Sequence, residues 1–204
     1  AGTILPSGLQ VGLGVKPVAT YRIHEQGILT VTGNEYDVAI NGRGFFQVQM
    51  PDGTTAYSRA GSLQTDDTGQ IVTPDGFPIT PSVTVPSDAL SVNINAAGVV
   101  SARIDGQTDE QVIGQIQLAA FVNPTGLESI GDNLLRETAA SGSPTTGNPQ
   151  SSGFGSLIQE SLEGSNVNVV TEVTNLIQAQ RAYEMNSRVI KTADDMLTTV
   201  SQLR

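Results

Sequence analysis

The last forty residues, 165–204, contain neither glycine nor proline, whereas the preceding chain is interrupted repeatedly by both. Because these two residues are the least favourable in a helix interior, their absence over such a length favours one long α-helix. About 34 helical residues at roughly 1.5 Å each would form a rod roughly 50 Å long, which exceeds the width of a small domain. Ser165 or Asn166 is expected to cap the first turn, since a short polar side chain there accepts a hydrogen bond from a free backbone N–H.

Side chains in this predicted helix repeat with spacings of alternately three and four residues, which places them on common helical faces. Two of the resulting stripes are apolar and one is polar. The first apolar stripe comprises Val169, Val173, Leu176, Tyr183, Ile190 and Leu197. The second apolar stripe comprises Ala182, Met185, Val189, Met196 and Leu203, flanked by Ala193 and Val200. The polar stripe comprises Arg181, Glu184, Arg188, Lys191, Asp195, Thr198 and Gln202.

The two apolar stripes adjoin each other, so together they cover almost half of the helix circumference. A helix that docks on a single domain needs only one such stripe. For helices in general, folding back onto the helix's own domain is the commoner arrangement. The width of the apolar surface and the length of the helix instead favour packing between molecules.

Charge is distributed unevenly, because residues 1–164 hold 16 acidic and 6 basic side chains while residues 165–204 hold 4 of each. A neutral helix can pack beside copies of itself without repulsion, and an acidic body keeps the unassembled protein soluble. The acidity argues against a nucleic-acid partner, since affinity for phosphates comes mainly from Lys and Arg. No stretch reaches the length of a membrane-spanning apolar helix, so we expect no membrane insertion.

Before the helix, glycine-containing turn signals such as Asp52-Gly53 and Asp105-Gly106 separate runs rich in Val, Ile, Thr, Phe and Tyr. This pattern is typical of hairpins. The predicted strands are 37–40, 44–50, 54–59, 90–94, 99–104 and 112–122, with shorter pieces near Ile71 and Val83. Because short turns join these strands without intervening helices, the fold class is mainly β, an antiparallel β sandwich or small barrel.

Composition divides the chain into three parts. Residues 1–20 are rich in glycine and proline without a helical period, and we expect an extended arm there. Residues 21–164 are expected to form the β domain, in which the Gly, Ser, Pro and Thr of residues 139–156 predict a flexible loop. Residues 165–204 form the C-terminal helix, which we expect to serve axial assembly.

The residues that common catalytic and metal sites require are scarce. The chain has no cysteine, which excludes disulfides, thiol catalysis and sulfur-ligated metals. His24 is the single histidine, and no nucleophile or orienting acid can be placed beside it. Adjacent acids, as at Asp66 and Asp67, are expected to be solvated surface. We therefore predict no enzyme activity, no cofactor and no metal.

Residues 37–48, DVAINGRGFFQV, resemble the D-[LV]-A-I-x-G-x-G-F-F-x-V signature of the bacterial flagellar axial proteins, the family of rod and hook subunits. The signature residues here are Asp37, Ile40, Gly42, Gly44, Phe45 and Phe46. The glycines permit a tight turn, and one of the two phenylalanine rings is expected to be buried. Residues 165–190 are similar to the terminal helix of the same family, most of all to its distal rod subunits, and residues 6–18 and 126–134 extend the resemblance.

The resemblance implies a non-enzymatic structural subunit of the distal rod in the periplasm-spanning basal body of the flagellum. Many copies would form a rigid hollow tube that transmits torque to the hook and encloses the export channel. The implied partners are other copies, the proximal rod and hook subunits, and the surrounding ring proteins. The apolar stripes would face neighbouring helices, and the polar stripe from Arg181 to Gln202 would face the channel.

Family members begin with a further helix, which this chain lacks, and the chain starts at Ala1 rather than methionine. We therefore expect that a natural N-terminal segment has been removed, and that its helix would be a neighbour of residues 169–202. The nearest alternative is a proximal rod or hook subunit, although hook subunits carry an extra outer domain. A secreted carbohydrate-binding β domain is a more distant alternative, since five Phe, four Tyr and no Trp offer few stacking platforms.

Overall fold

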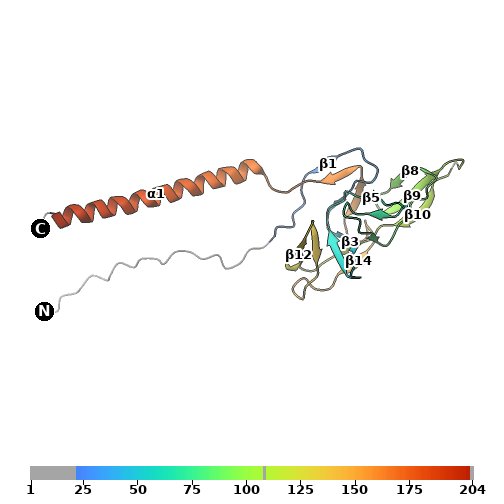
Figure 1. Ribbon diagram of the computed structural model, residues 1–204, viewed down its shortest axis with the longest axis horizontal. Helices are drawn as coiled ribbons and strands as arrows, with labels where there is room; N and C mark the ends of the chain where they lie inside the picture. The colour runs from blue at the N-terminus through green and yellow to red at the C-terminus, as the bar shows by residue number, and fades with distance from the viewer. Residues whose placement is uncertain (1–21, 108, 203–204) are drawn as a thin grey trace.

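In the described part of the chain one α-helix, α1 (Val169–Gln202), projects from one end of a body built of short strands (Figure 1). This computed structural model describes residues 22–107 and 109–202, together with the side chains of most of them. The predicted mainly β fold with a long C-terminal helix is confirmed. The arm predicted at residues 1–20 lies outside the described residues.

Among residues 22–107 and 109–168, the body has sixteen strands and one turn of 3-10 helix. In chain order these are β1 (Leu29–Val31), β2 (Val38–Asn41), β3 (Phe45–Gln49), β4 (Thr55–Ser58), β5 (Gln64–Thr65), β6 (Ile71–Val72), β7 (Ile79–Thr80), β8 (Ala89–Ile94), β9 (Val99–Ile104), β10 (Gln111–Gln115), β11 (Leu118–Ala120), η1 (Pro124–Gly126), β12 (Glu128–Gly131), β13 (Leu134–Arg136), β14 (Thr145–Gly147), β15 (Ser156–Gln159) and β16 (Ser161–Glu163).

The largest sheet runs in the order β12-β13-β4-β3-β11-β14, with β7 also paired to β3. A second sheet has the order β10-β9-β8, and three two-stranded ribbons pair β1 with β16, β2 with β15, and β5 with β6. All of these pairings are antiparallel, as the sequence predicts. Within the described residues no sheet closes on itself, so the small-barrel alternative is wrong.

The hydrophobic core lies on both sides of β3. Successive side chains of a strand point to opposite faces, so Phe46 packs with Ile40 and Leu118 in the main cluster while Phe45 packs with Tyr57 and Phe121 in a second one. Both phenylalanine rings are buried, at 1% and 4% exposure. The expected burial of one ring is confirmed, and the other ring is buried as well because β3 is an interior strand covered on both faces.

Two segments, one predicted as a strand and the other as a loop, differ from these predictions because the chain changes sheet within them. Residues 112–122 form two strands, since β10 pairs with β9 whereas β11 pairs with β3 and β14. The segment 139–156 contains β14, which no pattern in the sequence predicted, and ends where β15 begins. The mobility of the rest of that segment stays a prediction. No strand forms at Val83, although this side chain is buried.

Candidate assembly interface

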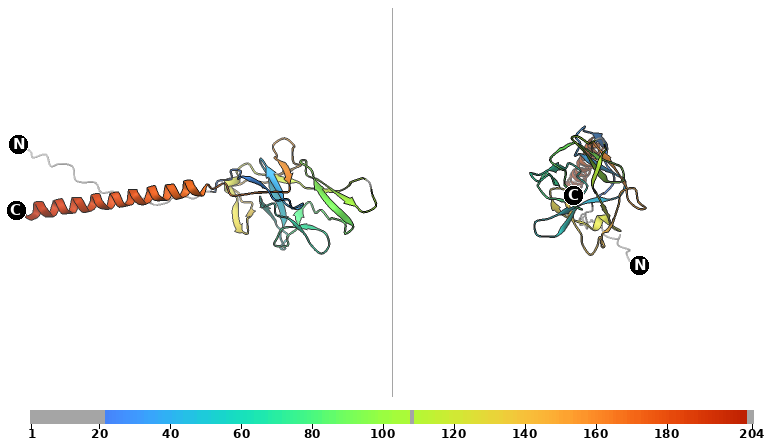
Figure 2. Two further views of the ribbon diagram at one scale, coloured as in Figure 1. Left: turned by 90° about the horizontal axis from the view of Figure 1, so that it is seen from above. Right: turned by 90° about the vertical axis from the view of Figure 1, so that its right-hand side faces the viewer.

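No part of the β body covers α1, which leaves one end of the body along its long axis in two perpendicular views (Figures 1 and 2). Every side chain described in α1 is exposed, except for the half-buried Ser187. The large side chains of the two apolar stripes are between 48% and 77% exposed; they are Val169, Val173, Leu176, Tyr183, Met185, Val189, Ile190 and Met196. Leu197 lies in the helix, but its side chain is outside the described part. Exposed apolar surface of this extent is typical of a protein–protein interface.

The polar stripe is also open to solvent. Arg181, Glu184, Arg188, Lys191 and Asp195 are all exposed. The ion pairs found among the described residues, Arg59–Glu163 and Arg136–Glu128, both lie in the body. The charged groups of these five side chains are therefore available to solvent or to a neighbouring molecule. No helix in the described part of the chain is long and apolar enough to cross a membrane.

Asn168 caps the first turn of α1. Its side-chain Oδ1 accepts hydrogen bonds from the backbone N–H of Val170 at 3.0 Å and of Thr171 at 3.3 Å. The prediction of Ser165 or Asn166 as the cap is therefore wrong. Asn166 instead donates from Nδ2 to the carbonyls of Ile23 and Glu25, at 3.2 and 3.1 Å, which keeps this part of the chain extended.

The segment before α1 runs antiparallel to the segment that enters the body. β1 and β16 pair over three residues, and the N–H of Gly164 donates to the carbonyl of Ile28 at 2.8 Å. The N–H of Gly27 donates to Oε1 of Glu163 at 2.9 Å. A Cβ on Gly27 would lie 1.9 Å from the carbonyl oxygen of Gly164, so only glycine allows this approach. We call residues 22–31 and 161–168 the root of the helix.

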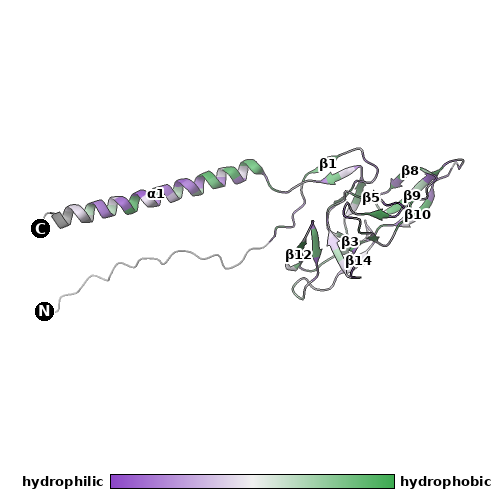
Figure 3. Ribbon diagram, in the orientation of Figure 1, coloured by the Kyte–Doolittle hydropathy of each residue, from purple (hydrophilic) through white to green (hydrophobic). Residues whose placement is uncertain are grey.

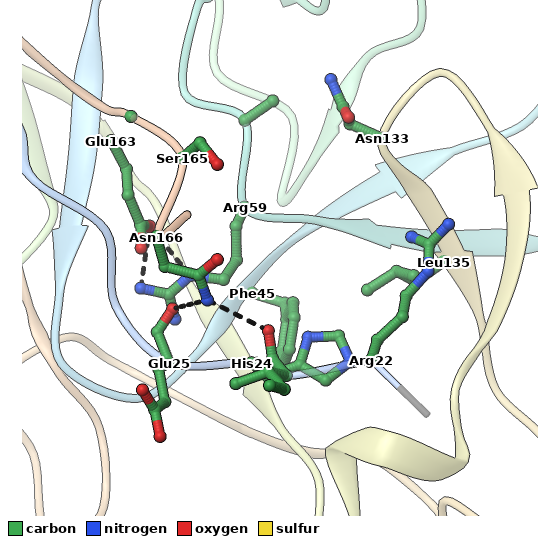
Figure 4. A pocket seen from close by; sticks show the side chains of 13 residues that line it. Arg22, His24, Glu25, Phe45, Arg59, Asn133, Leu135, Glu163, Ser165 and Asn166 are labelled. Atoms are coloured by element: carbon green, nitrogen blue, oxygen red, sulfur yellow. Dashed lines mark hydrogen bonds and ion pairs between the residues drawn. The ribbon is translucent and has the colours of Figure 1, made fainter. Parts of the chain in front are cut away.

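A network around Arg59 ties the root to the signature turn at Gly42 and Gly44. Figure 4 shows Arg59 beside Glu163 and Phe45 in this network. Its Nε and Nη2 both lie 2.9 Å from Oε2 of Glu163, and its Nη1 donates to the carbonyls of Gly42 and Gly44 at 3.0 and 3.1 Å. The guanidinium also lies 6.0 Å from the centre of the Phe45 ring. Only 20% of the Arg59 side chain and 10% of the Glu163 side chain are exposed. We call this network the Arg59 clamp; charge-assisted bonds of this kind are the strong ones.

The other signature residues build the turn that the clamp holds. Asp37 is buried and accepts hydrogen bonds from Oγ1 of Thr32 at 2.6 Å and Nδ2 of Asn34 at 3.1 Å. Gly42 and Gly44 have φ values of 110° and 140°, which glycine adopts without strain. The structure thus gives the signature an architectural role at the helix root. The sequence motif alone offered no sign of its partner Arg59, or of Glu163, which lies 104 residues further along.

His24 lines an open hollow of about 510 Å³ at the root, together with Arg59, Glu163 and Asn166 (Figure 4). Its ring meets the Phe45 ring edge-on at 5.9 Å. Partial burial lowers the pKa of His24 below its usual 6.5, and the positive charges of Arg22 and Arg59 lower that pKa further. These surroundings keep the imidazole neutral near pH 7. Within the described residues, no three His, Cys, Asp or Glu side chains gather where they could hold a metal ion.

Two family models match the chain. One describes the D1 domain of the flagellar hook protein FlgE/F/G and matches residues 39–102, which include most of the signature. The other describes the C-terminal part of the flagellar basal body rod FlgEFG proteins and matches residues 158–203, which include α1. The two matched segments are thus the ones that meet at the Arg59 clamp.

Curated relatives match over nearly all of the chain. It is 54% identical over 203 residues to the flagellar basal-body rod protein FlgG of Caulobacter vibrioides, covering 100% of this chain and 78% of that protein. It is 55% identical over 201 residues to FlgG of Buchnera aphidicola, covering 98% and 77%. The flagellar hook protein FlgE of Salmonella typhimurium is 44% identical over 119 residues, which cover 58% of this chain and 29% of the hook protein. The chain therefore belongs to the flagellar rod and hook family, and within it to the basal-body rod proteins FlgG.

Proposed function

We propose that α1 is the polymerisation element of this distal rod subunit and that its two apolar stripes pack against helices of neighbouring copies. The observation that carries the proposal is the exposure of eight large apolar side chains on a helix that the body leaves uncovered. Burial of a Val, Leu or Ile side chain contributes about 1.5–3 kcal/mol. Covering these stripes would therefore contribute on the order of 10 kcal/mol per helix, before the entropic cost of association.

In the assembled rod, copies would stack head to tail with a rotation between them, because a repeated heterologous contact generates a helical polymer. The helices, residues 165–204, would form the inner wall of a rigid hollow tube, and the β body, residues 21–164, would form the outer layer. Equal numbers of acidic and basic side chains in residues 165–204 support close packing of the helices. The excess of acidic side chains in the body suits a solvated outer surface.

The polar stripe from Arg181 to Asp195 would face the central channel, through which other subunits are exported. A wall of mixed charges offers unfolded chains no apolar surface to bind. At its two ends the tube would contact proximal rod and hook subunits, and its outer surface would turn inside the ring proteins. A structure of the rod with Arg188 and Lys191 buried between helices would overturn the assignment of the channel face.

The Arg59 clamp would couple the body to the inner tube. Torque that enters through the helix must reach the body through the root, where the chain crosses as two extended segments. The clamp links both of them to the signature turn through Gly27, Glu163, Gly42 and Gly44. Such a connection resists rotation of the helix relative to the body.

Substitution of Leu176 or Ile190 by Asp in the complete subunit tests the packing role. Rod growth and motility should be lost, because a charge in an apolar helix contact lacks a partner, while the β body stays folded. The matched control is Thr198→Asp, which places the same charge on the polar stripe and should leave motility intact. Motile cells carrying Leu176→Asp and Ile190→Asp would refute the packing role of the first stripe.

A further inference from the structure

The apolar face of α1 changes position partway along the helix. Near the body, Val169, Val170, Val173, Leu176 and Ile177 form one exposed apolar surface, which we call the root patch. Figure 3 shows the hydrophobic colour concentrated at this end of α1, followed by mixed colours towards the C-terminus. At 100° per residue these five side chains span about one third of the helix circumference.

Helical geometry shows which face the root patch occupies. Eighteen residues complete five turns of an α-helix, so residues eighteen apart point in the same direction. Val170 and Ile177 therefore lie on the same line as Arg188 and Asp195 of the polar stripe. The face proposed to line the channel is thus apolar near the body, where Val170 is 75% exposed and Ile177 is 43% exposed.

The opposite exchange occurs on the face of the second apolar stripe. Thr171 and Gln178 lie eighteen residues before Val189 and Met196, and all four side chains are exposed. A face that is apolar in the outer part of α1 is therefore polar near the body. The exchange takes place between Ile177 and Ala182, so the apolar surface of α1 near the body lies on a different side of the helix from that of the outer part.

We propose that the root patch is an interface for a second copy of this chain, and that the channel-facing surface of α1 begins only at Arg181. This rests on the proposed function and specifies it further. Val169, Val173 and Leu176 belong to the root patch and to the first apolar stripe, so the two surfaces are continuous. A partner that covers the first apolar stripe therefore also reaches the root patch. Little charge opposes this contact, because Glu172 is the single charged residue between residues 169 and 177.

The chain contains no cysteine, so single-cysteine variants of the complete subunit can report the environment of each position. The informative variants are Val170→Cys and Ile177→Cys. Arg188→Cys and Asp195→Cys are matched controls, because they point in the same directions five turns away. Each variant is expressed with an excess of unmodified subunit, so that rod assembly does not depend on the variant. Labelling with a small maleimide is then compared between two samples, the unassembled subunit and purified basal bodies with open channels.

Before assembly, all four positions should react at comparable rates. In the rods, labelling at positions 170 and 177 should fall by about tenfold or more, whereas positions 188 and 195 should remain reactive through the channel. Undiminished labelling at 170 and 177 in the rods would overturn the inference. Selective protection of these two positions before assembly would mean that another segment of the same chain covers the root patch. That result would refute the proposal that a second copy covers it. Protection of all four positions in the rods would instead refute the proposed channel face, and with it the boundary at Arg181.

Discussion

Substitution of Arg59 by Ala should destabilise the body far more than an ordinary surface substitution. It removes both contacts to Oε2 of Glu163 and the hydrogen bonds to the carbonyls of Ile40, Gly42 and Gly44. It also removes the ion-pair partner of a Glu163 side chain that is only 10% exposed in the intact protein. Removal of one partner from a fully buried ion pair costs about 3–5 kcal/mol. Because 20% of the Arg59 side chain is exposed, we expect the free energy of unfolding to fall by about 2–4 kcal/mol.

Thermal unfolding followed by circular dichroism in the β region measures this loss. For a domain of this size, 1 kcal/mol corresponds to about 2–4 °C, so Tm should fall by roughly 4–16 °C. The matched control is Arg136→Ala, which breaks the ion pair with Glu128 at 2.8 Å, where both side chains are more than half exposed. That variant should leave Tm unchanged within error, since exposed pairs contribute little.

A double-mutant cycle separates the pair from its surroundings. If the clamp acts as a unit, Arg59→Ala combined with Glu163→Gln should cost clearly less than the sum of the two single variants, because the second change removes the unpaired charge that the first creates. Additive effects of the two substitutions, or a Tm for Arg59→Ala equal to that of Arg136→Ala, would refute the reasoning.

Three further predictions concern the root and the start of the helix. Asn168→Ala should cost about 1 kcal/mol in helix stability and reduce the helical circular dichroism signal, because Oδ1 no longer caps Val170 and Thr171; an equal loss from Ser165→Ala would contradict this assignment. Gly27→Ala should destabilise the body by about 1–3 kcal/mol in urea unfolding, since its Cβ would meet the Gly164 carbonyl, and an unchanged midpoint would show that the root can open. Because the pKa of His24 is lowered below 6.5 on folding, its contribution to stability is full above that pH and is lost as the pH falls towards the folded-state value. The Tm of His24→Gln should therefore depend less on pH than that of the unmodified protein between about pH 7.5 and pH 5.5. An identical dependence of Tm on pH in the two proteins would refute this role of His24.

Features that depend on neighbouring residues could be predicted well. Residues 165–204 lack glycine and proline and carry a helical period, and α1 has 34 residues as expected. Strands such as β8 and β9 were predicted within one residue, since turn residues bound them and their pairing is local. The flagellar signature likewise indicated the family before any contact was known.

Errors and incomplete predictions arose wherever a distant segment decides the local structure. Ser165 and Asn166 are good capping residues, yet the helix starts later because Asn166 is held by the carbonyls of Ile23 and Glu25. Phe45 and Phe46 are both buried because β3 has neighbours on both edges and clusters on both faces. Residues 112–122 divide because each half pairs with a different sheet.

By itself, the sequence determined that this chain ends in one long helix with too much apolar surface for a single domain, and that the signature belongs to flagellar rod and hook proteins. Helical period and turn chemistry depend on residues a few positions apart, so they can be recognised from the sequence without knowledge of the fold. The Arg59 clamp, the pairing at the root and the cap at Asn168 were decided only by the tertiary structure. Arg59 and Glu163 lie 104 residues apart, and nothing near either one indicates that packing will bring a guanidinium and a carboxylate to within 2.9 Å of each other.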